Sequence, residues 1–235
     1  IIGSTGNDRI NGGGRFDTLD YSNLAGSVTL GGSGDIAKGS VDAAGIGSLG
    51  NDQLVGESTA PFTNTIERII GNANFTNTID GQLNAAGNGS FVIDLSQELL
   101  TVNISTPGVG PFTFNVENFD NVVGTVNDDS ITGNDNDNVF TGSTGDDTIN
   151  GLGGNDTVDY SELEGALTLG GSGDIAKGVV DANGIGSLGN DLLIGTGAGT
   201  PADPIVNSIE TIIGNEEVTN TIRGQLKVDP PDTSS

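Results

Sequence analysis

The stretch that decides the fold runs from Gly124 to Asp159 and reads GTVNDDSIT, GNDNDNVFT, GSTGDDTIN, GLGGNDTVD. It consists of four consecutive units of nine residues, each beginning with Gly and each carrying Asp or Asn at its fifth and sixth positions. The eighth position is apolar in every unit: Ile131, Phe140, Ile149 and Val158. Short units of constant length that punctuate a chain with Gly-rich turns are typical of repeat architectures, in which neighbouring units stack.

Similar units stand outside this stretch, at residues 3–11, 12–20, 47–55 and 186–194. They belong to a longer repeat, because residues 3–56 align with 142–195 at an offset of 139. Of the 54 aligned positions 14 differ, which leaves 40 identical, and LGGSGDIAKG occurs in both copies. Residues 66–83 match 209–226 at 13 of 18 positions. The two ends of the chain are therefore copies of one theme.

The middle of the chain is a degenerate third copy of the same theme. FVIDLS at 91–96 is similar to TLDYS at 18–22, and FDNVVGT at 119–125 is similar to IERIIGN at 66–72. We therefore expect a single domain rather than two of different composition. Its predicted limits are 1–227, made of the homologous stretches 1–83, 84–139 and 140–227, with 228–235 as a tail or linker.

Composition excludes several classes of function. The 235 residues include 32 Asp and Glu against 7 Lys and Arg, a net charge of −25, and contain no Cys or His. Disulfides, thiolate metal sites and an imidazole base are impossible in such a chain. The negative charge opposes binding to nucleic acid, whose phosphates require Lys and Arg. The sequence contains no apolar run of about 18 residues, so it predicts no membrane-spanning helix. The 33% hydrophobic share indicates a thin core.

The nine-residue unit has a direct structural interpretation. Its first six residues favour a turn, because Gly, Asn and Asp tolerate left-handed backbone conformations. Its last three residues, such as Thr148–Asn150, suit a short strand with the middle side chain directed inward. Two units then form one coil of about 18 residues, and successive coils stack with parallel strands about 4.8 Å apart. The expected fold is an all-β parallel solenoid built of stacked short coils.

Stacked turns create an electrostatic problem that a cation solves. Turns one coil apart project carboxylates toward each other, and like charges at that separation repel. Calcium suits such a site, because it takes six to eight oxygen ligands in flexible geometry. We expect Asp129 to share an ion with Asp147, and Asn138 with Asp156. The alternative interpretation is that each Asp only caps its own turn.

GSTGDDTIN and GLGGNDTVD closely resemble the RTX (repeat-in-toxin) nonapeptide, GGxGxDxUx, of secreted bacterial calcium-binding proteins. The resemblance implies a right-handed parallel β-solenoid, the β-roll, with calcium ions in its turns. It places the calcium ligands at Asp8, Asp17, Asp129, Asp147 and Asp156, with further candidates at Asp52 and Asp191. Two departures stand out, because Asn138 replaces the motif's Asp, and Arg15 adds a positive charge to the turn before Asp17.

Other polar residues recur at matched points of the two copies. For Asp20, Tyr21, Asp159 and Tyr160 a coil corner with a hydrogen-bonded carboxylate is favoured over a catalytic or sugar-binding site. Lys38 and Lys177 stand in identical AKG contexts. We expect them to be solvated or, preferably, to neutralise the neighbouring Asp35 and Asp174. No set of residues indicates catalysis within this chain.

These observations lead to three functional hypotheses. The first is an extracellular, calcium-stabilised structural protein of a bacterial surface layer, adhesin stalk or fibril, with type I secretion implied by the resemblance. The second is a non-catalytic RTX domain that assists folding and secretion of an extracellular hydrolase. The third is an ice-binding or polysaccharide-binding module.

The expected partners follow from the first hypothesis. A solenoid exposes unpaired strand edges at its ends, so we expect head-to-tail self-association into a filament. Asp8 has no evident partner 18 residues away, and we expect it to share calcium across such a junction. Cell-surface polysaccharide is a second candidate partner.

Overall fold

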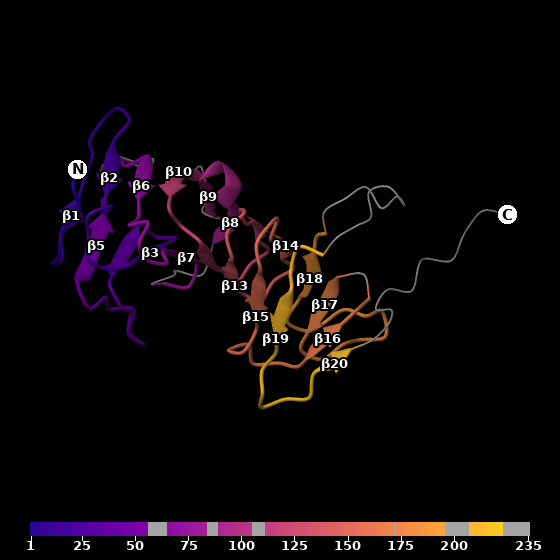
Figure 1. Ribbon diagram of the computed structural model, residues 1–235. Helices are drawn as coiled ribbons and strands as arrows, with labels where there is room; N and C mark the ends of the chain where they lie inside the picture. Colours follow the sequence, from indigo (N-terminus) through magenta and orange to yellow (C-terminus); the bar gives the residue numbers. More distant parts are fainter. Residues whose placement is uncertain (56–64, 84–88, 105–110, 172, 196–206, 223–235) are drawn as a thin grey trace, which may run out of the picture.

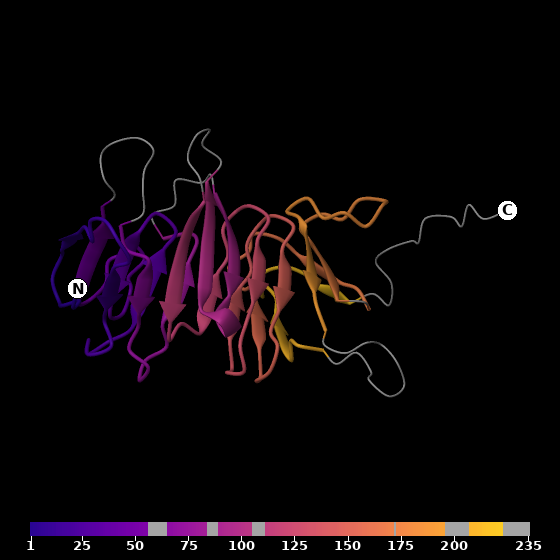
Figure 2. The same cartoon turned by 90° about the horizontal axis from the view of Figure 1, so that it is seen from above.

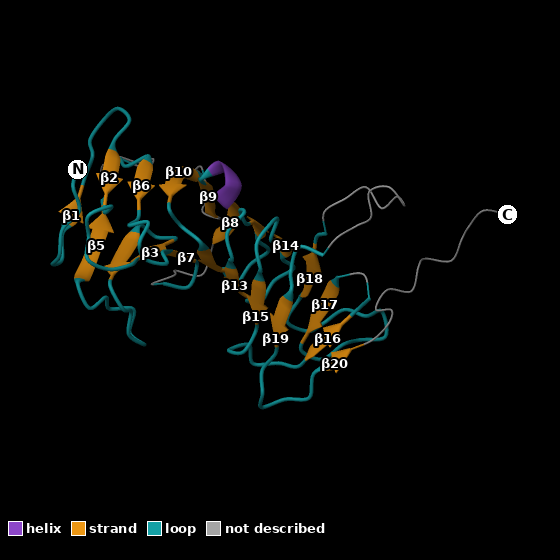
Figure 3. Ribbon diagram, in the orientation of Figure 1, coloured by secondary structure: helices purple, strands orange, loops and turns teal. Residues whose placement is uncertain are grey.

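The computed structural model describes residues 1–55, 65–83, 89–104, 111–171, 173–195 and 207–222 (Figure 1). This part of the chain is mostly β structure in two large, largely parallel sheets, and its helical content is one 3-10 turn, η1 (Leu95–Gln97). Figure 3 shows loops joining short strands along the whole molecule. The predicted all-β, largely parallel structure is confirmed. The predicted tail, 228–235, lies outside the described residues.

The strands form one sheet of nine and one of eleven. In spatial order the nine-stranded sheet contains β1 (Arg9–Ile10), β5 (Gly50–Leu54), β4 (Asp35–Lys38), β3 (Val28–Gly31), β7 (Thr78–Asp80), β11 (Asn121–Val123), β13 (Val139–Thr141), β15 (Thr157–Asp159) and β19 (Thr211–Ile213). The eleven-stranded sheet contains β2 (Thr18–Asp20), β6 (Arg68–Ile70), β10 (Phe112–Glu117), β9 (Leu99–Ile104), β8 (Gly89–Asp94), β12 (Ser130–Thr132), β14 (Thr148–Asn150), β18 (Asn190–Leu193), β17 (Asp174–Lys177), β16 (Leu167–Leu169) and β20 (Thr221–Ile222). Figure 2 shows these strands side by side along the length of the molecule.

The nine-residue units give the chain its regular alternation between sheets. From β11 to β15 each successive strand lies in the other sheet. Ser130 is therefore paired in parallel with Thr148, and Val139 with Thr157, at the predicted spacing of 18 residues. The middle residue of each strand points inward, which buries the apolar eighth position of every unit. The core is consequently a narrow row of Ile, Val, Leu and Phe side chains between the sheets.

Antiparallel excursions interrupt the parallel stacking, and the sequence interpretation did not include them. β4 pairs antiparallel with β3 and β5, β9 with β8 and β10, and β17 with β16 and β18. The reversal after β3 is a tight turn in which the Gly34 N–H donates to the Gly31 carbonyl at 3.0 Å. Gly34 has a φ of +83°, a conformation that Gly adopts at little cost. Each excursion adds residues without adding a parallel step.

Equivalent strands of the two copies lie in different sheets. β1 of the first copy (residues 3–56) belongs to the nine-stranded sheet, whereas its equivalent in the second copy (residues 142–195), β14, belongs to the eleven-stranded sheet. The same exchange holds for every equivalent pair of strands, from β2 and β15 to β7 and β20. The copies therefore present their equivalent turns on different sheets of the molecule.

Candidate functional site

Most of the sixth-position side chains of the turns are buried in the protein. Six of the eight candidate metal ligands are buried: Asp52, Asp129, Asn138, Asp147, Asp156 and Asp191. The five carboxylates accept hydrogen bonds from backbone N–H groups of other segments, and the Asn138 amide oxygen accepts one from Asn134 of its own turn. Buried polar groups are stable only when paired in this way.

These side chains form an inner ladder along the stack. The Asp129 N–H donates to Asp147 Oδ1 at 3.0 Å, and the Asp147 N–H donates to Asp191 Oδ1 at 3.0 Å. On the other sheet the Asn138 N–H donates to Asp156 Oδ1 at 2.8 Å. The structure thus brings together both pairs expected from the spacing, and a hydrogen bond joins the members of each pair.

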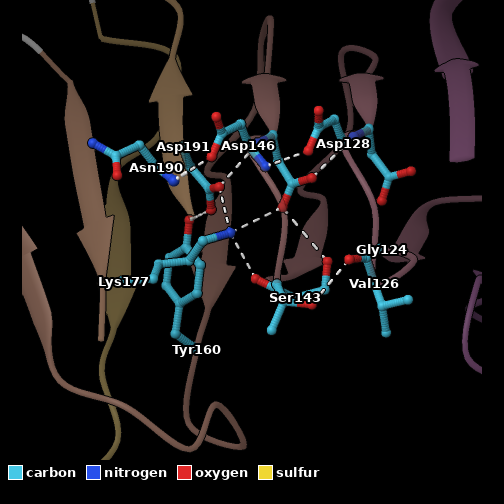
Figure 4. A network of polar contacts seen from close by, with 12 residues as sticks. Gly124, Val126, Asp128, Ser143, Asp146, Tyr160, Lys177, Asn190 and Asp191 are labelled. Atoms are coloured by element: carbon cyan, nitrogen blue, oxygen red, sulfur yellow. Dashed lines mark hydrogen bonds and ion pairs between the residues drawn. The ribbon is translucent and has the colours of Figure 1, made fainter. Parts of the chain in front are cut away.

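A second ladder runs through the exposed fifth positions in the opposite direction. The Asp146 N–H donates to Asp128 Oδ1, and the Asn190 N–H donates to Asp146 Oδ1, both at 2.8 Å (Figure 4). In the inner ladder the N–H of one turn donates to the side chain of the next turn along the chain. In the outer ladder the N–H donates to the side chain of the preceding turn. Each turn is therefore held to both neighbours by side chains as well as by the sheets.

The most distinctive cluster is the second-copy lysine centre, which comprises Lys177, Asp147, Asp191, Tyr160 and Ser143 (Figure 4). The Lys177 ammonium lies 2.5 Å from Asp191 Oδ1, 3.2 Å from Asp147 Oδ2 and 2.6 Å from the Ser143 carbonyl oxygen. The Tyr160 hydroxyl donates to Asp191 Oδ2 at 2.5 Å. The Lys177 side chain is 0% exposed. The ammonium is therefore bound by oxygens in the interior.

The first-copy lysine centre comprises Lys38, Asp52, Tyr21, Ser4 and Gly6. The Lys38 ammonium lies 2.5 Å from Asp52 Oδ1, 2.6 Å from the Ser4 carbonyl oxygen and 2.8 Å from the Gly6 carbonyl oxygen. The Tyr21 hydroxyl donates to Asp52 Oδ2 at 2.5 Å. The expectation that Lys38 is solvated or neutralises Asp35 is therefore wrong, because the chain folds it inward onto Asp52.

Backbone packing fixes the tyrosine that orients each carboxylate. A Cβ placed on Gly142 would lie 2.1 Å from Cε1 of Tyr160, and one on Gly3 would lie equally close to the Tyr21 ring. Each ring therefore packs flat against a glycine backbone. These residues came out of the sequence analysis as coil corners with a hydrogen-bonded carboxylate, but their partners, Asp52 and Asp191, were not foreseen.

Burial perturbs the acids of the second-copy centre. Desolvation raises the pKa of Asp147 to about 8, the charge of Asp191 adds to the rise, and Lys177 opposes it. Desolvation also raises the pKa of Asp191, again against the effect of Lys177. The pKa of Tyr160 is raised by burial and by Asp191, so this hydroxyl stays a hydrogen-bond donor. One ammonium is thus shared by two buried carboxyl groups.

Asp129, one turn further along the inner ladder, is satisfied differently. Its carboxylate accepts hydrogen bonds from the Phe91 N–H, the Thr125 N–H and the Thr125 hydroxyl, at 2.6, 2.6 and 2.9 Å. Burial raises its pKa, and these bonds oppose the rise. In this structure Asp129 acts as a cap for two backbone segments.

The remaining ladder ends in glutamates, which the sequence analysis missed. The Asp156 N–H donates to Glu210 Oε2 at 2.8 Å, and the equivalent Asp17 N–H donates to Glu67 Oε2 at 2.7 Å. The recurring IExII motif at 66–70 and 209–213 was the available signal. Oδ2 of Asp156 and Oδ2 of Asp17 are buried without a hydrogen-bond partner. Burial, followed by the charges of Glu210 and Asp137, raises the pKa of Asp156 to about 6.

Asp8 also has a partner that spacing did not reveal. Its N–H donates to Asp52 Oδ1 at 3.0 Å, across 44 residues rather than 18, because the antiparallel excursion lies between them. The Asp8 side chain itself is exposed and accepts from the Ser4 hydroxyl at 3.3 Å. The partner of Asp8 thus lies outside the 18-residue spacing, and the sharing of calcium across a junction stays a prediction.

Comparison with known proteins adds no family assignment. No protein-family model matches the chain, and no curated protein matches it. Within the described ranges no three acidic side chains converge as a metal-binding group, and no helix is long and apolar enough to cross a membrane.

Proposed function

We propose that this chain is an extracellular structural protein, a right-handed parallel β-solenoid of stacked short coils resembling the RTX β-roll. The observation that carries the proposal is the alternation of strands between two sheets at an 18-residue step, with side-chain ladders joining successive turns. A repeat of this kind is extended by nearest-neighbour stacking and suits a stalk, surface layer or fibril. Catalysis is no part of the proposal.

Calcium enters the proposal at the two glutamate-ended turns. Asp156 and Glu210 place two carboxylates at one turn, and Asp156 Oδ2 is buried there without a partner. Asp17 and Glu67 repeat the arrangement in the other copy. An oxygen-rich site with uncompensated negative charge fits a hard divalent cation, which would supply the missing positive charge.

Thermal unfolding followed by circular dichroism tests this function. We expect the melting temperature to rise between EDTA and millimolar calcium, because extracellular modules bind calcium at about 10⁻⁴–10⁻³ M. The double substitution Asp156→Asn with Glu210→Gln should lose part of that rise, because the turn of Asp17 and Glu67 remains, and the matched control Asp8→Asn should keep all of it. Identical unfolding curves in EDTA and in calcium would contradict the calcium-binding function.

Self-association is the proposed mode of assembly. β1 and β2 stand at one end of the two sheets, and β19 and β20 stand at the other. Exposed apolar side chains mark both ends, with Ile2 and Ile222 among the most exposed. Strand edges of this kind favour head-to-tail addition of a second copy. Electron microscopy in millimolar calcium should show filaments that Ile222→Lys abolishes, and monomers alone in the wild type would contradict it.

A further inference from the structure

We infer that the ammonium groups of Lys38 and Lys177 are the resident cations of their turns, tethered to the chain, and that these two turns take no metal ion. The inference rests on the proposed calcium function and deepens it, because it separates the turns that take calcium from those that do not. It excludes Asp52, Asp147 and Asp191 from the set of calcium ligands expected from the RTX resemblance.

The side-chain nitrogen of each lysine is surrounded by oxygens as a bound cation would be. A lysine ammonium has three N–H donors and no acceptor. Each of the two ammonium groups has three oxygens within 3.2 Å, one to two from carboxylates and the rest from turn carbonyls. Carboxylates and backbone carbonyls are also the ligands that calcium takes in a loop. The nitrogen therefore occupies the place, and uses the oxygens, that a bound ion would need.

The positive charge of the ammonium compensates the buried acids and opposes a second cation. Buried carboxylates need hydrogen-bond donors or a positive partner, and Lys177 is 0% exposed beside Asp191, also 0%, and Asp147, at 3%. Adding a divalent cation beside a fixed ammonium would bring two positive charges into contact. The turn at Asp156 contrasts with this arrangement, because its neighbouring carboxylate belongs to Glu210 and its Oδ2 has no partner.

Both lysines are carried by strands of the antiparallel excursions. Lys38 ends β4 and Lys177 ends β17, the middle strands of two of the three antiparallel excursions. Without these excursions no strand would run back through the stack at that point. Lys38 is held over Gly47, where an added Cβ would lie 2.4 Å from the Lys38 backbone nitrogen and oxygen, and Gly186 approaches Lys177 as closely. The excursion thus delivers a cation to its turn.

Terbium luminescence tests the inference, because the chain has two tyrosines and no tryptophan, and each tyrosine ring lies beside one lysine. Lys38 Nζ lies 5.9 Å from the Tyr21 centroid, and Lys177 Nζ lies 6.0 Å from the Tyr160 centroid. Terbium takes the oxygen ligands that calcium takes, and tyrosine sensitises its emission only at short range. An ion in place of either ammonium is therefore reported by its own tyrosine.

We expect Lys177→Met to create a terbium site. Its tyrosine-sensitised emission should rise saturably above the wild-type level, and calcium should compete for the site. In EDTA the variant should lose stability, with the folding equilibrium constant reduced about a hundredfold to several thousandfold, as for a broken buried ion pair. Millimolar calcium should restore most of the loss. Tyr160→Phe in the same background should remove the added emission, whereas Tyr21→Phe should leave it.

The charge-balanced variant Lys177→Met with Asp191→Asn protects the test against simple misfolding. We expect it to fold in EDTA and to give no added emission, because one carboxylate charge leaves with the ammonium. Saturable tyrosine-sensitised terbium binding in the Asp156→Asn, Glu210→Gln protein that Tyr160→Phe abolishes would overturn the inference. So would a folded Lys177→Met variant with full stability in EDTA and no added emission. Neither result depends on whether calcium stabilises the Asp156 turn, so the two proposals fail separately.

Discussion

The two lysine centres share most of their sequence but not their contacts. In the second copy the ammonium contacts two carboxylates, Asp191 and Asp147. In the first copy Asp8, the equivalent of Asp147, is exposed, and Lys38 takes the Gly6 carbonyl oxygen instead. The difference comes from the stack. β14 lies between β12 and β18, whereas β1 is the end strand of its sheet and has β5 as its described neighbour. A neighbouring turn, rather than the local sequence, decides whether the sixth-position Asp is buried.

The largest effect is expected from removing the ammonium groups. Lys177→Met should destabilise the fold by about 3–5 kcal/mol in EDTA, because it leaves the buried acids Asp147 and Asp191 without a counter-charge. Lys38→Met should cost less, because it leaves one buried acid, Asp52. Urea unfolding at fixed pH measures both. Equal losses would show that Asp147 does not contribute to the second centre.

Core truncation gives the next effect. Ile149→Ala should cost about 2–5 kcal/mol, because it opens a cavity between strands on both sides. Ile10→Ala, at the equivalent position of the end strand, should cost less, since Ile10 is already 8% exposed against 1% for Ile149. The same urea titration compares the two. A larger loss for Ile10→Ala would contradict the idea that stacking neighbours set the stability of each copy.

Removing the sixth-position carboxylate should also destabilise the second copy more than the first. Asp147→Ala removes the acceptor of the Asp129 N–H and should cost about 1–3 kcal/mol. Asp8→Ala should stay within about 0.5 kcal/mol, as for an exposed residue. A Lys177→Met background should abolish the difference if Asp147 acts through the ammonium alone, and should keep part of it if the backbone bond matters.

The last comparison concerns pH and the buried carboxyl group of Asp147. Its pKa is raised to about 8 in the fold from an ordinary 3.8, by burial and by Asp191 and Asp129. The protonated carboxyl is therefore favoured in the folded state. This stabilisation is complete below pH 3.8 and is lost as pH rises through about 8. The difference in unfolding free energy between wild type and Asp147→Asn should shrink toward low pH, and a difference that does not change with pH would contradict the raised pKa.

The sequence alone determined the repeat, the strand class and the spacing of the stack. Gly-rich turns and an apolar eighth position recur every nine residues, and these are local properties that any reader of Gly124–Asp159 can find. The pairing of Asp129 with Asp147 followed from the same period, because parallel stacking translates each turn by one coil.

Only the tertiary structure decided what neutralises the turns. The ammonium of Lys177 reaches Asp147 from 30 residues away, and Asp8 meets Asp52 across 44 residues, through antiparallel excursions that no period announces. Glu67 and Glu210 likewise lie far from Asp17 and Asp156 in the sequence. The residues between them bring each glutamate to the N–H of its aspartate. A period predicts contacts at its own spacing. Charges carried in by an insertion are placed by packing, so their partners become visible only when the chain is folded.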